Sequence, residues 1–263
     1  MVRYKTSVVT NADGQELHLP GSDVFTMPHA LLDSIDVRVV STIQEYPIGT
    51  RLVDGDNVYR YAEYGGTTKA GDLCQSEAPD AAHDLMDPGN HAIGATSITL
   101  VESITLVLNE YAGGKFITEG GAGGGFTYDI ISNTAVSAAA GGIIVLKQGL
   151  TVAITTATNV RLMKSRWKEI IICPTSLTGT VAGVGLGVGA DGSFGWVCTK
   201  GPVGAMQDLT AGASFGVGLI PGATAGELAL YDVSATADIQ PVATQIMTAT
   251  GDTLLGTVLM QLE

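Results

Sequence analysis

The sequence contains little charge, and positive charge is the scarcer sign. Only 15% of the 263 residues are charged, and 13 lysines and arginines stand against 26 aspartates and glutamates, which gives a formal net charge of -13. A chain of this charge repels another polyanion at long range. Direct binding to nucleic acid is therefore not expected.

Long hydrophobic runs and paired cysteines are also scarce. The longest apolar stretches, such as residues 141–146, are far shorter than the roughly 20 residues of a membrane-spanning helix, and the polar amino-terminal residues do not resemble a secretory signal. The three cysteines, Cys74, Cys173 and Cys198, are odd in number and widely spaced. We expect a soluble protein whose cysteines are buried free thiols rather than disulfides or metal ligands.

Glycine and small or β-branched residues are abundant instead. Hydrophobic residues make up 45% of the chain although aromatic residues make up only 6%, and there are 35 glycines. This composition is apolar enough for a core and too apolar for disorder. The length allows one large β domain or two small ones.

Alternation of apolar and polar residues, the period of a half-buried strand, dominates the chain. It is clearest in residues 97–100 and 103–108. Similar runs are residues 142–146, 151–155, 169–173, 180–189, 194–199, 214–220, 227–233 and 254–262, and turn dipeptides such as Asp54-Gly55, Asp191-Gly192 and Gly201-Pro202 separate several of them. We predict an all-β fold, an antiparallel sandwich or barrel with glycine-rich turns.

The amino-terminal residues 1–35 differ from the rest. They are polar, they are interrupted by glycine and proline, and they contain two isolated apolar pairs, Val24-Phe25 and Leu31-Leu32. One interpretation is an extended amino-terminal arm whose apolar pairs anchor it on a neighbouring surface. A first edge strand packed on its own domain fits the pattern equally well.

The remaining residues, 36–263, are predicted to form the β-rich domain. A division within the region 90–175 would give two β subdomains. Helical signals are restricted to residues 79–86 and 23–36, and both are too short to organise a domain.

Two segments match the sequence patterns of a catalytic and a dinucleotide-binding motif, but the residues that follow them do not fit the structure that each motif requires. Residues 212–216 fit the G-x-S-x-G elbow with Ser214 as nucleophile, yet a predicted strand follows and all four histidines precede Ser214. Residues 187–192 fit the dinucleotide pattern G-x-G-x-x-G, yet they lead into another strand, which favours a hairpin turn. The glycine run 120–125 lacks the lysine of a phosphate loop. We assign no catalytic residue and expect no cofactor.

Metal-capable side chains are concentrated in one polar stretch. It contains Asp80, His83, Asp84, Asp87 and His91. A proline and a glycine break any helix before His91, and no second pair of ligands completes a familiar spacing. A loop at residues 54–57 lacks the further oxygen ligands that a hard cation needs. We predict a solvated loop rather than a metal site.

The few basic residues gather beside a tryptophan. On an acidic protein such a patch could dock on an acidic partner with Trp167 as an aromatic anchor. An exposed loop with ordinary solubilising charges explains the same residues. Together with the apolar pairs of the arm, the candidate partner contacts are Val24, Phe25, Leu31, Leu32, Arg161, Lys164, Arg166, Trp167 and Lys168.

Several segments occur in an order that is typical of one group of proteins. They are residues 46–67 (YPIGTRLVDGDNVYRYAEYGGT), 70–75 (AGDLCQ), 109–116 (NEYAGGKF), 125–130 (GFTYDI), 194–202 (FGWVCTKGP) and 251–260 (GDTLLGTVLM). In their succession they resemble virion structural proteins of tailed bacteriophages, of the capsid decoration or cement type. The similarity covers most of residues 46–263, rests on strand-and-glycine patterns, and does not extend to residues 1–45.

The resemblance implies a viral structural protein without enzymatic activity. Such a protein binds the major capsid protein on the outer face of the shell, commonly as a homotrimer, and clamps the joints between capsid subunits. It is made in the host cytoplasm and resides on the capsid exterior, with no nucleic-acid or membrane contact. The alternative is a phage tail or host-recognition module that binds glycans, for which Trp167, Trp196 and scattered tyrosines would have to supply aromatic platforms.

Overall fold

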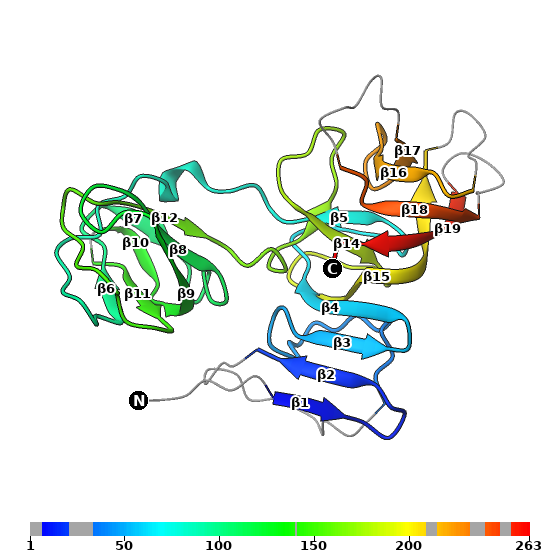
Figure 1. The fold of residues 1–263 in the computed structure, drawn as a ribbon, viewed down its shortest axis with the longest axis horizontal. Coiled ribbons are helices and arrows are strands. Elements are labelled where there is room, and N and C mark those ends of the chain that lie inside the picture. The colour runs from blue at the N-terminus through cyan, green and yellow to red at the C-terminus, as the bar shows by residue number, and fades with distance from the viewer. Residues whose placement is uncertain (1–6, 21–33, 140, 209–214, 232–239, 248–253) are drawn as a thin grey trace. The chain divides into compact units, whose positions relative to one another are not determined.

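The computed structural model describes residues 7–20, 34–139, 141–208, 215–231, 240–247 and 254–263. This part of the chain is all-β, which confirms the predicted fold class (Figure 1). Its one helical element is the 3₁₀ helix η1 (Ala81–His83), which lies within the predicted short helical segment 79–86. Within these ranges no helix has the length and apolar character needed to cross a membrane.

The chain forms two compact units. Unit 1 comprises Met1–Ala78 and Arg166–Glu263, and unit 2 comprises Pro79–Ser165, which is inserted between the two parts of unit 1. Each unit has its own cluster of buried apolar side chains. The division into two β subdomains that the sequence leaves open is therefore an insertion rather than a succession.

Unit 1 begins with a run of antiparallel neighbours. The strands are β1 (Ser7–Thr10), β2 (Glu16–Leu19), β3 (Arg51–Asp54) and β4 (Asn57–Glu63), paired in that order. In the β1–β2 turn the buried Asn11 side chain donates to Gln15 Oε1 at 2.6 Å. Residues 7–19 of the predicted arm thus form the edge strand β1 and its neighbour β2, which pairs with β3 of their own domain. The anchor residues Val24, Phe25, Leu31 and Leu32 lie outside the described residues.

The long strand β15 (Phe194–Gln207) is central to unit 1. Its first half pairs with β4 and with β14 (Val181–Gly185), and its second half pairs with β19 (Leu254–Gln261). The predicted turn at Gly201-Pro202 is wrong, because both residues stay in register with β19. Gly201 has φ +97°, and a Cβ there would lie 2.1 Å from Asn57 Oδ1, so only glycine fits this point of the strand.

The pairings of β15 close a ring of five strands. β17 (Leu228–Leu230) pairs with β15 and with β16 (Gly218–Pro221), β16 pairs with β18 (Ala243–Met247), and β18 pairs with β19, which returns to β15. The β15–β17 pairing is parallel and the others in the ring are antiparallel. Buried side chains from all five strands fill the ring, which makes it a small β-barrel; among them are Ala205, Leu219, Leu228, Ala243 and Val258.

Two short strands join the residues on either side of the insertion. β5 (Leu73–Gln75) precedes unit 2 in the sequence and β13 (Ile171–Ile172) follows it, and the two pair with each other. β5 also pairs with β14, and through it with the sheet that contains β15. The chain therefore leaves and re-enters unit 1 at neighbouring strands.

Unit 2 contains two sheets around one core. The strands are β6 (Ser97–Thr99), β7 (Ile104–Leu106), β8 (Lys115–Gly120), β9 (Phe126–Asn133), β10 (Val136–Ala139), β11 (Ile143–Leu146) and β12 (Asn159–Met163). The larger sheet has the order β12-β8-β9-β11-β6, and β10 pairs with β7 in the smaller one. Ile104 and Leu106 of the small sheet are buried in the same cluster as Phe116 and Ile144 of the large one. The predicted strand 151–155 makes only an isolated bridge, between Ile154 and His91.

The two ends of unit 2 meet. The backbones of Met86 and Val160 exchange hydrogen bonds in both directions at 2.9 Å. Next to them the Arg161 guanidinium donates to both carboxylate oxygens of Asp84 at 2.7 and 2.8 Å. A unit whose ends are joined in this way does not depend on its neighbour to close its core.

We expect residues 79–165 to fold when expressed alone, because their core is formed within the unit and their ends meet. Urea titration of the fragment followed by far-UV circular dichroism should show one cooperative transition. In the same fragment Phe116→Ala should lower the free energy of unfolding by about 3–5 kcal/mol, because Phe116 is fully buried. A fragment with no cooperative transition would contradict an autonomous unit.

Two buried tyrosines of unit 1 give a matched pair of substitutions. Among the described residues the Tyr64 hydroxyl, which is fully buried, has no hydrogen-bond partner, whereas the Tyr61 hydroxyl accepts from Glu45 N at 3.0 Å. Tyr64→Phe should leave stability unchanged or raise it by about 1 kcal/mol, and Tyr61→Phe should lower it by about 1 kcal/mol. Both tryptophans belong to unit 1, so urea titration followed by tryptophan fluorescence reports this unit. A Tyr64→Phe variant that is less stable than Tyr61→Phe would refute the conclusion that the buried Tyr64 hydroxyl has no hydrogen-bond partner among the described residues.

Candidate functional site

An exposed apolar pair lies on unit 2 directly after β7. Val107 and Leu108 are 65% and 63% exposed. Single exposed apolar residues are common on soluble proteins, whereas adjacent ones on a fixed backbone offer a contact surface. The pair therefore offers a contact surface if hydrogen bonds fix the backbone of the surrounding loop, residues 107–111.

The buried side chain of Asn133, at the end of β9, organises this loop. Its Nδ2 donates to the Val107 carbonyl oxygen at 2.7 Å, and its Oδ1 accepts from Tyr111 N at 2.8 Å. The Glu110 carboxylate accepts from Val107 N at 2.9 Å, and Asn109 N donates to the Asn133 carbonyl oxygen at 3.0 Å. Hydrogen bonds thus fix the backbone on both sides of the apolar pair.

A histidine holds the same region from η1. The His83 side chain is buried, its Nε2 is 3.1 Å from the Thr105 carbonyl oxygen, and its Nδ1 is hydrogen-bonded to the Tyr111 hydroxyl. Because a carbonyl oxygen only accepts, Nε2 carries a proton, and in the neutral imidazole Nδ1 accepts from Tyr111. His83 therefore has a structural partner on each ring nitrogen.

The other metal-capable side chains of this stretch also hold local structure. Asp80 accepts from a backbone N–H of η1, and Asp87 accepts from the N–H two residues further on. Asp84 binds Arg161, and His91 Nε2 lies 2.8 Å from a backbone carbonyl oxygen. In the described ranges no three histidine, cysteine, aspartate or glutamate side chains are grouped so that they could hold a metal ion.

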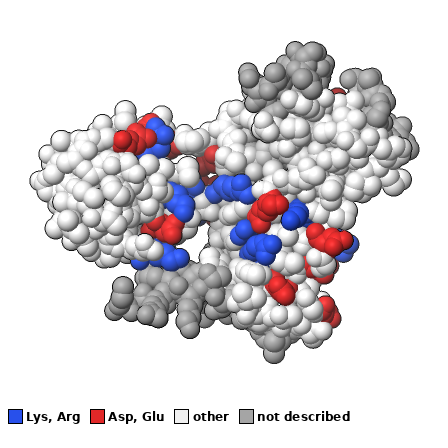
Figure 2. Space-filling view, in the orientation of Figure 1, with Lys and Arg blue, Asp and Glu red and all other residues white. Residues whose placement is uncertain are grey.

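Two of the predicted contact residues, Arg161 and Lys164, are engaged within unit 2. Besides Asp84, Arg161 binds Glu119 at 3.0 Å, and Lys164 binds Glu110 at 3.2 Å. The hydrogen bond from Arg161 lowers the pKa of Asp84 below its ordinary value. In the view of Figure 2, basic side chains lie beside acidic ones instead of forming a basic patch.

The other three, Arg166, Trp167 and Lys168, belong to unit 1. Trp167 is only 9% exposed, with the Arg166 guanidinium 4.3 Å from its ring centroid. Lys168 Nζ lies 3.0 Å from Glu63 Oε2. Trp167, the predicted aromatic anchor, is thus largely covered within unit 1, and the alternative of an exposed loop with ordinary solubilising charges does not describe its ring. Partner contact by these residues stays a prediction.

An ion-pair cluster lies close to these residues in unit 1. Glu263 Oε1 is 2.6 Å from Arg60 Nε, and Glu263 Oε2 is 3.4 Å from Arg51 Nε. Burial alone would raise the pKa of Glu263, but the two arginines outweigh it and hold that pKa below its ordinary value of 4.5. The Arg60 guanidinium also lies 5.5 Å from the Trp167 ring centroid.

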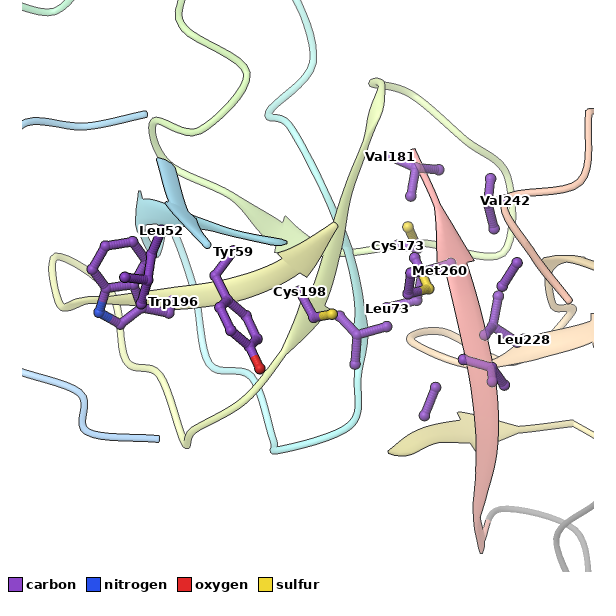
Figure 3. Close-up of a cluster of buried hydrophobic side chains, with 14 of the residues drawn as sticks. Leu52, Tyr59, Leu73, Cys173, Val181, Trp196, Cys198, Leu228, Val242 and Met260 are labelled. Carbon is purple, nitrogen blue, oxygen red and sulfur yellow. The ribbon is translucent and has the colours of Figure 1, made fainter. Parts of the chain in front are cut away.

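The three cysteines are free and buried, as predicted. Figure 3 shows Cys173 and Cys198 among the apolar side chains of the unit 1 core. Burial raises the pKa of each of these two thiols to about 12 and that of Cys74 further. All three thiols stay protonated near neutral pH, and a protonated thiol is a poor nucleophile.

The two motifs of catalytic appearance have different outcomes. Residues 187–192 lie between β14 and β15, which pair antiparallel, so the glycines form the predicted hairpin connection. Ser214 lies outside the described residues, and its motif is not tested. In the glycine run 120–125, Gly120 ends β8 and residues 121–125 connect it to β9.

Unit 1 also contains a cavity of about 230 Å³ that the sequence does not reveal. Aromatic rings from separate parts of the chain meet at it: Tyr46 precedes β3, Tyr61 lies in β4, and Phe194 and Trp196 lie in β15. The remaining lining residues are Ser34, Ile35, Asp36, Val39, Ser41 and Glu45. The Tyr46 and Trp196 ring centroids are 5.2 Å apart, and those of Tyr61 and Trp196 are 5.1 Å apart.

The sequence does not indicate the apolar pair, because the alternation predicts one strand over residues 103–108. In the structure β7 ends at Leu106, and Leu108 is exposed although the alternation predicts it to be buried. The available signal is Val107, which breaks the alternation because it makes three large apolar residues, 106–108, consecutive.

The comparisons with known proteins give no relative. No protein-family model matches the chain, and no curated protein or solved structure matches it at a significant level.

The Glu263 cluster predicts a pH dependence of stability. A carboxylate with a lowered pKa stabilises the fold fully above its unfolded pKa of about 4.5, and this stabilisation is lost as the pH falls through the lower folded value. Glu263→Gln should cost about 1–2 kcal/mol at pH 7, and the difference from the unchanged chain should shrink between pH 5 and pH 3 (about the range of carboxyl titration). Urea titrations followed by tryptophan fluorescence measure it.

Asp191→Asn is the control for this pH series, because it removes an exposed carboxylate from the turn between β14 and β15. It should change stability little at any pH. A Glu263→Gln deficit that stays constant from pH 7 to pH 3 would show that the arginines do not stabilise the charged form.

Proposed function

We propose that the chain is a virion structural protein of a tailed bacteriophage, which binds the outer face of the capsid as a decoration or cement protein. The resemblance to such proteins of segments that span most of residues 46–263 motivates the proposal. The observation that carries it in the structure is the 107–111 loop, which presents Val107 and Leu108 on a backbone fixed by Asn133 and Glu110.

The energetics of this loop suit protein–protein contact. Covering the exposed two thirds of the Val107 and Leu108 side chains contributes roughly 1–2 kcal/mol each in favour of association. Because the loop is already ordered by its hydrogen bonds, little conformational entropy is lost when a partner covers it. A small apolar contact of this kind is weak alone and strong when it is repeated.

Repetition is what a capsid lattice provides. A homotrimer, the proposed state, would present three such loops, and their simultaneous engagement multiplies single affinities through effective concentration. Anything that binds only the assembled shell stabilises it by mass action, so no turnover and no cofactor are required. The net charge of -13 disfavours contact with the packaged nucleic acid and fits a place outside the shell.

The experiment deletes the gene in the phage that encodes the chain and complements it with variants. Particles without the protein should rupture at a temperature several degrees below that of complete particles. Complementation with the unchanged chain should restore the original rupture temperature. Val107→Ser combined with Leu108→Ser should bind the deleted particles at least tenfold more weakly in co-sedimentation, since the lost contact area corresponds to more than about 1.4 kcal/mol. Circular dichroism of the variant should be unchanged.

Ile93→Ser is the matched control, because Ile93 is also an apolar residue of unit 2 and is 68% exposed. It should bind the particles as the unchanged chain does. Equal rupture temperatures with and without the protein would refute the cement role. Electron microscopy of particles that carry a tagged chain separates shell from tail, and density on the tail alone would favour the host-recognition alternative.

A further inference from the structure

The aromatic-lined cavity of unit 1 is independent of the proposed capsid contact, which lies on unit 2. Three of its rings are almost fully covered: Tyr46, Tyr61 and Trp196 are 4%, 2% and 3% exposed. Two other lining residues, Val39 and Asp36, are exposed. Buried rings therefore form the floor of the cavity and exposed residues form its mouth.

The charged groups around this cavity are of one sign. Asp36 and Glu45 line it, and no lysine, arginine or histidine is among the lining residues. Arg38 lies 3.7 Å from Asp36, but both side chains are largely exposed, so water screens this pair. The described residues provide no ion-pair partner for the Glu45 carboxylate, which leaves it as the main uncompensated charge at the site.

The aromatic groups add to the attraction for a cation. Burial raises the pKa of Tyr61 to about 12, so its hydroxyl is neutral near neutral pH. Neutral tyrosine and tryptophan rings attract cations through their π-systems. Carboxylates beside aromatic rings, without a basic side chain, disfavour an anion and favour a positively charged group.

A stacked sugar fits these observations less well. Sugar rings bind on broad exposed aromatic faces, whereas the floor rings expose only 2–4% of their surface. An ammonium group is much smaller than a sugar ring, so it needs only a small opening over an aromatic ring beside the carboxylates. We propose that this cavity binds an alkylammonium group, supplied either by a lysine side chain of a partner protein or by a free amine.

The test uses the tryptophan that lines the cavity. The chain contains two tryptophans, so Trp167→Phe leaves Trp196 as the single reporter. We expect n-butylammonium chloride, titrated into this full-length variant at constant ionic strength, to change Trp196 fluorescence saturably, with half-saturation on the order of millimolar. Nα-acetyl-lysine methylamide, titrated in parallel, distinguishes the sources: tighter binding than butylammonium assigns the site to a lysine in a polypeptide, and equal or weaker binding assigns it to a free amine.

Glu45→Gln, made in the same background, should weaken butylammonium binding roughly fivefold or more. The fold should persist, because it is the backbone N–H of Glu45 that is bonded to Tyr61. Asp191→Asn removes a charge elsewhere in unit 1 and should leave binding unchanged. The proposal is overturned if neither ammonium probe saturates, if Glu45→Gln binds as tightly as its parent, or if methyl α-glucopyranoside saturates the signal and the ammonium probes do not.

Discussion

The backbone hydrogen bonds of β15 are the constraint on which unit 1 depends. This single strand pairs with β4, β14, β17 and β19, whose residues come from positions as distant as 57 and 261. Such non-local pairing requires long loops to be closed before any core is buried. Because the two halves of β15 pair with different partners, the strand has to continue without a break over its 14 residues. Gly201 makes this possible, because its positive φ and missing Cβ let the strand pass Asn57 and continue from the sheet into the barrel.

The same logic explains how a second unit is inserted without disturbing the first. β5 and β13 pair across the point where unit 2 leaves and re-enters, and within unit 2 Met86 and Val160 do the same. Each core is thus closed by its own backbone pairing. A substitution on the surface of unit 2 therefore need not change the stability of the barrel, and the proposed contact at the 107–111 loop is independent of the proposed site in the aromatic cavity.

The sequence predicted the class of the fold and many of the strands, because alternation is a local property that the final sheet preserves, as in residues 97–99 and 104–106. It failed where tertiary pairing overrides local preference. Gly201-Pro202 has the composition of a turn, yet β19 holds it in a strand. Residues 151–155 alternate like a strand, yet only Ile154 finds a partner. Neither outcome can be read from the neighbouring residues alone.

The candidate site was harder to predict because its chemistry depends on partners far away in the sequence. Arg161 looks like a free cation until Asp84, 77 residues earlier, is seen to bind it in two hydrogen bonds. Val107 and Leu108 look like the end of a strand until Asn133 is seen to fix the loop that exposes them. In both cases a buried or ion-paired polar group determines which side chains at the surface are available for contact. Here the polar residues fix the loop and the apolar residues supply its exposed area, which is the arrangement that the proposed contact requires.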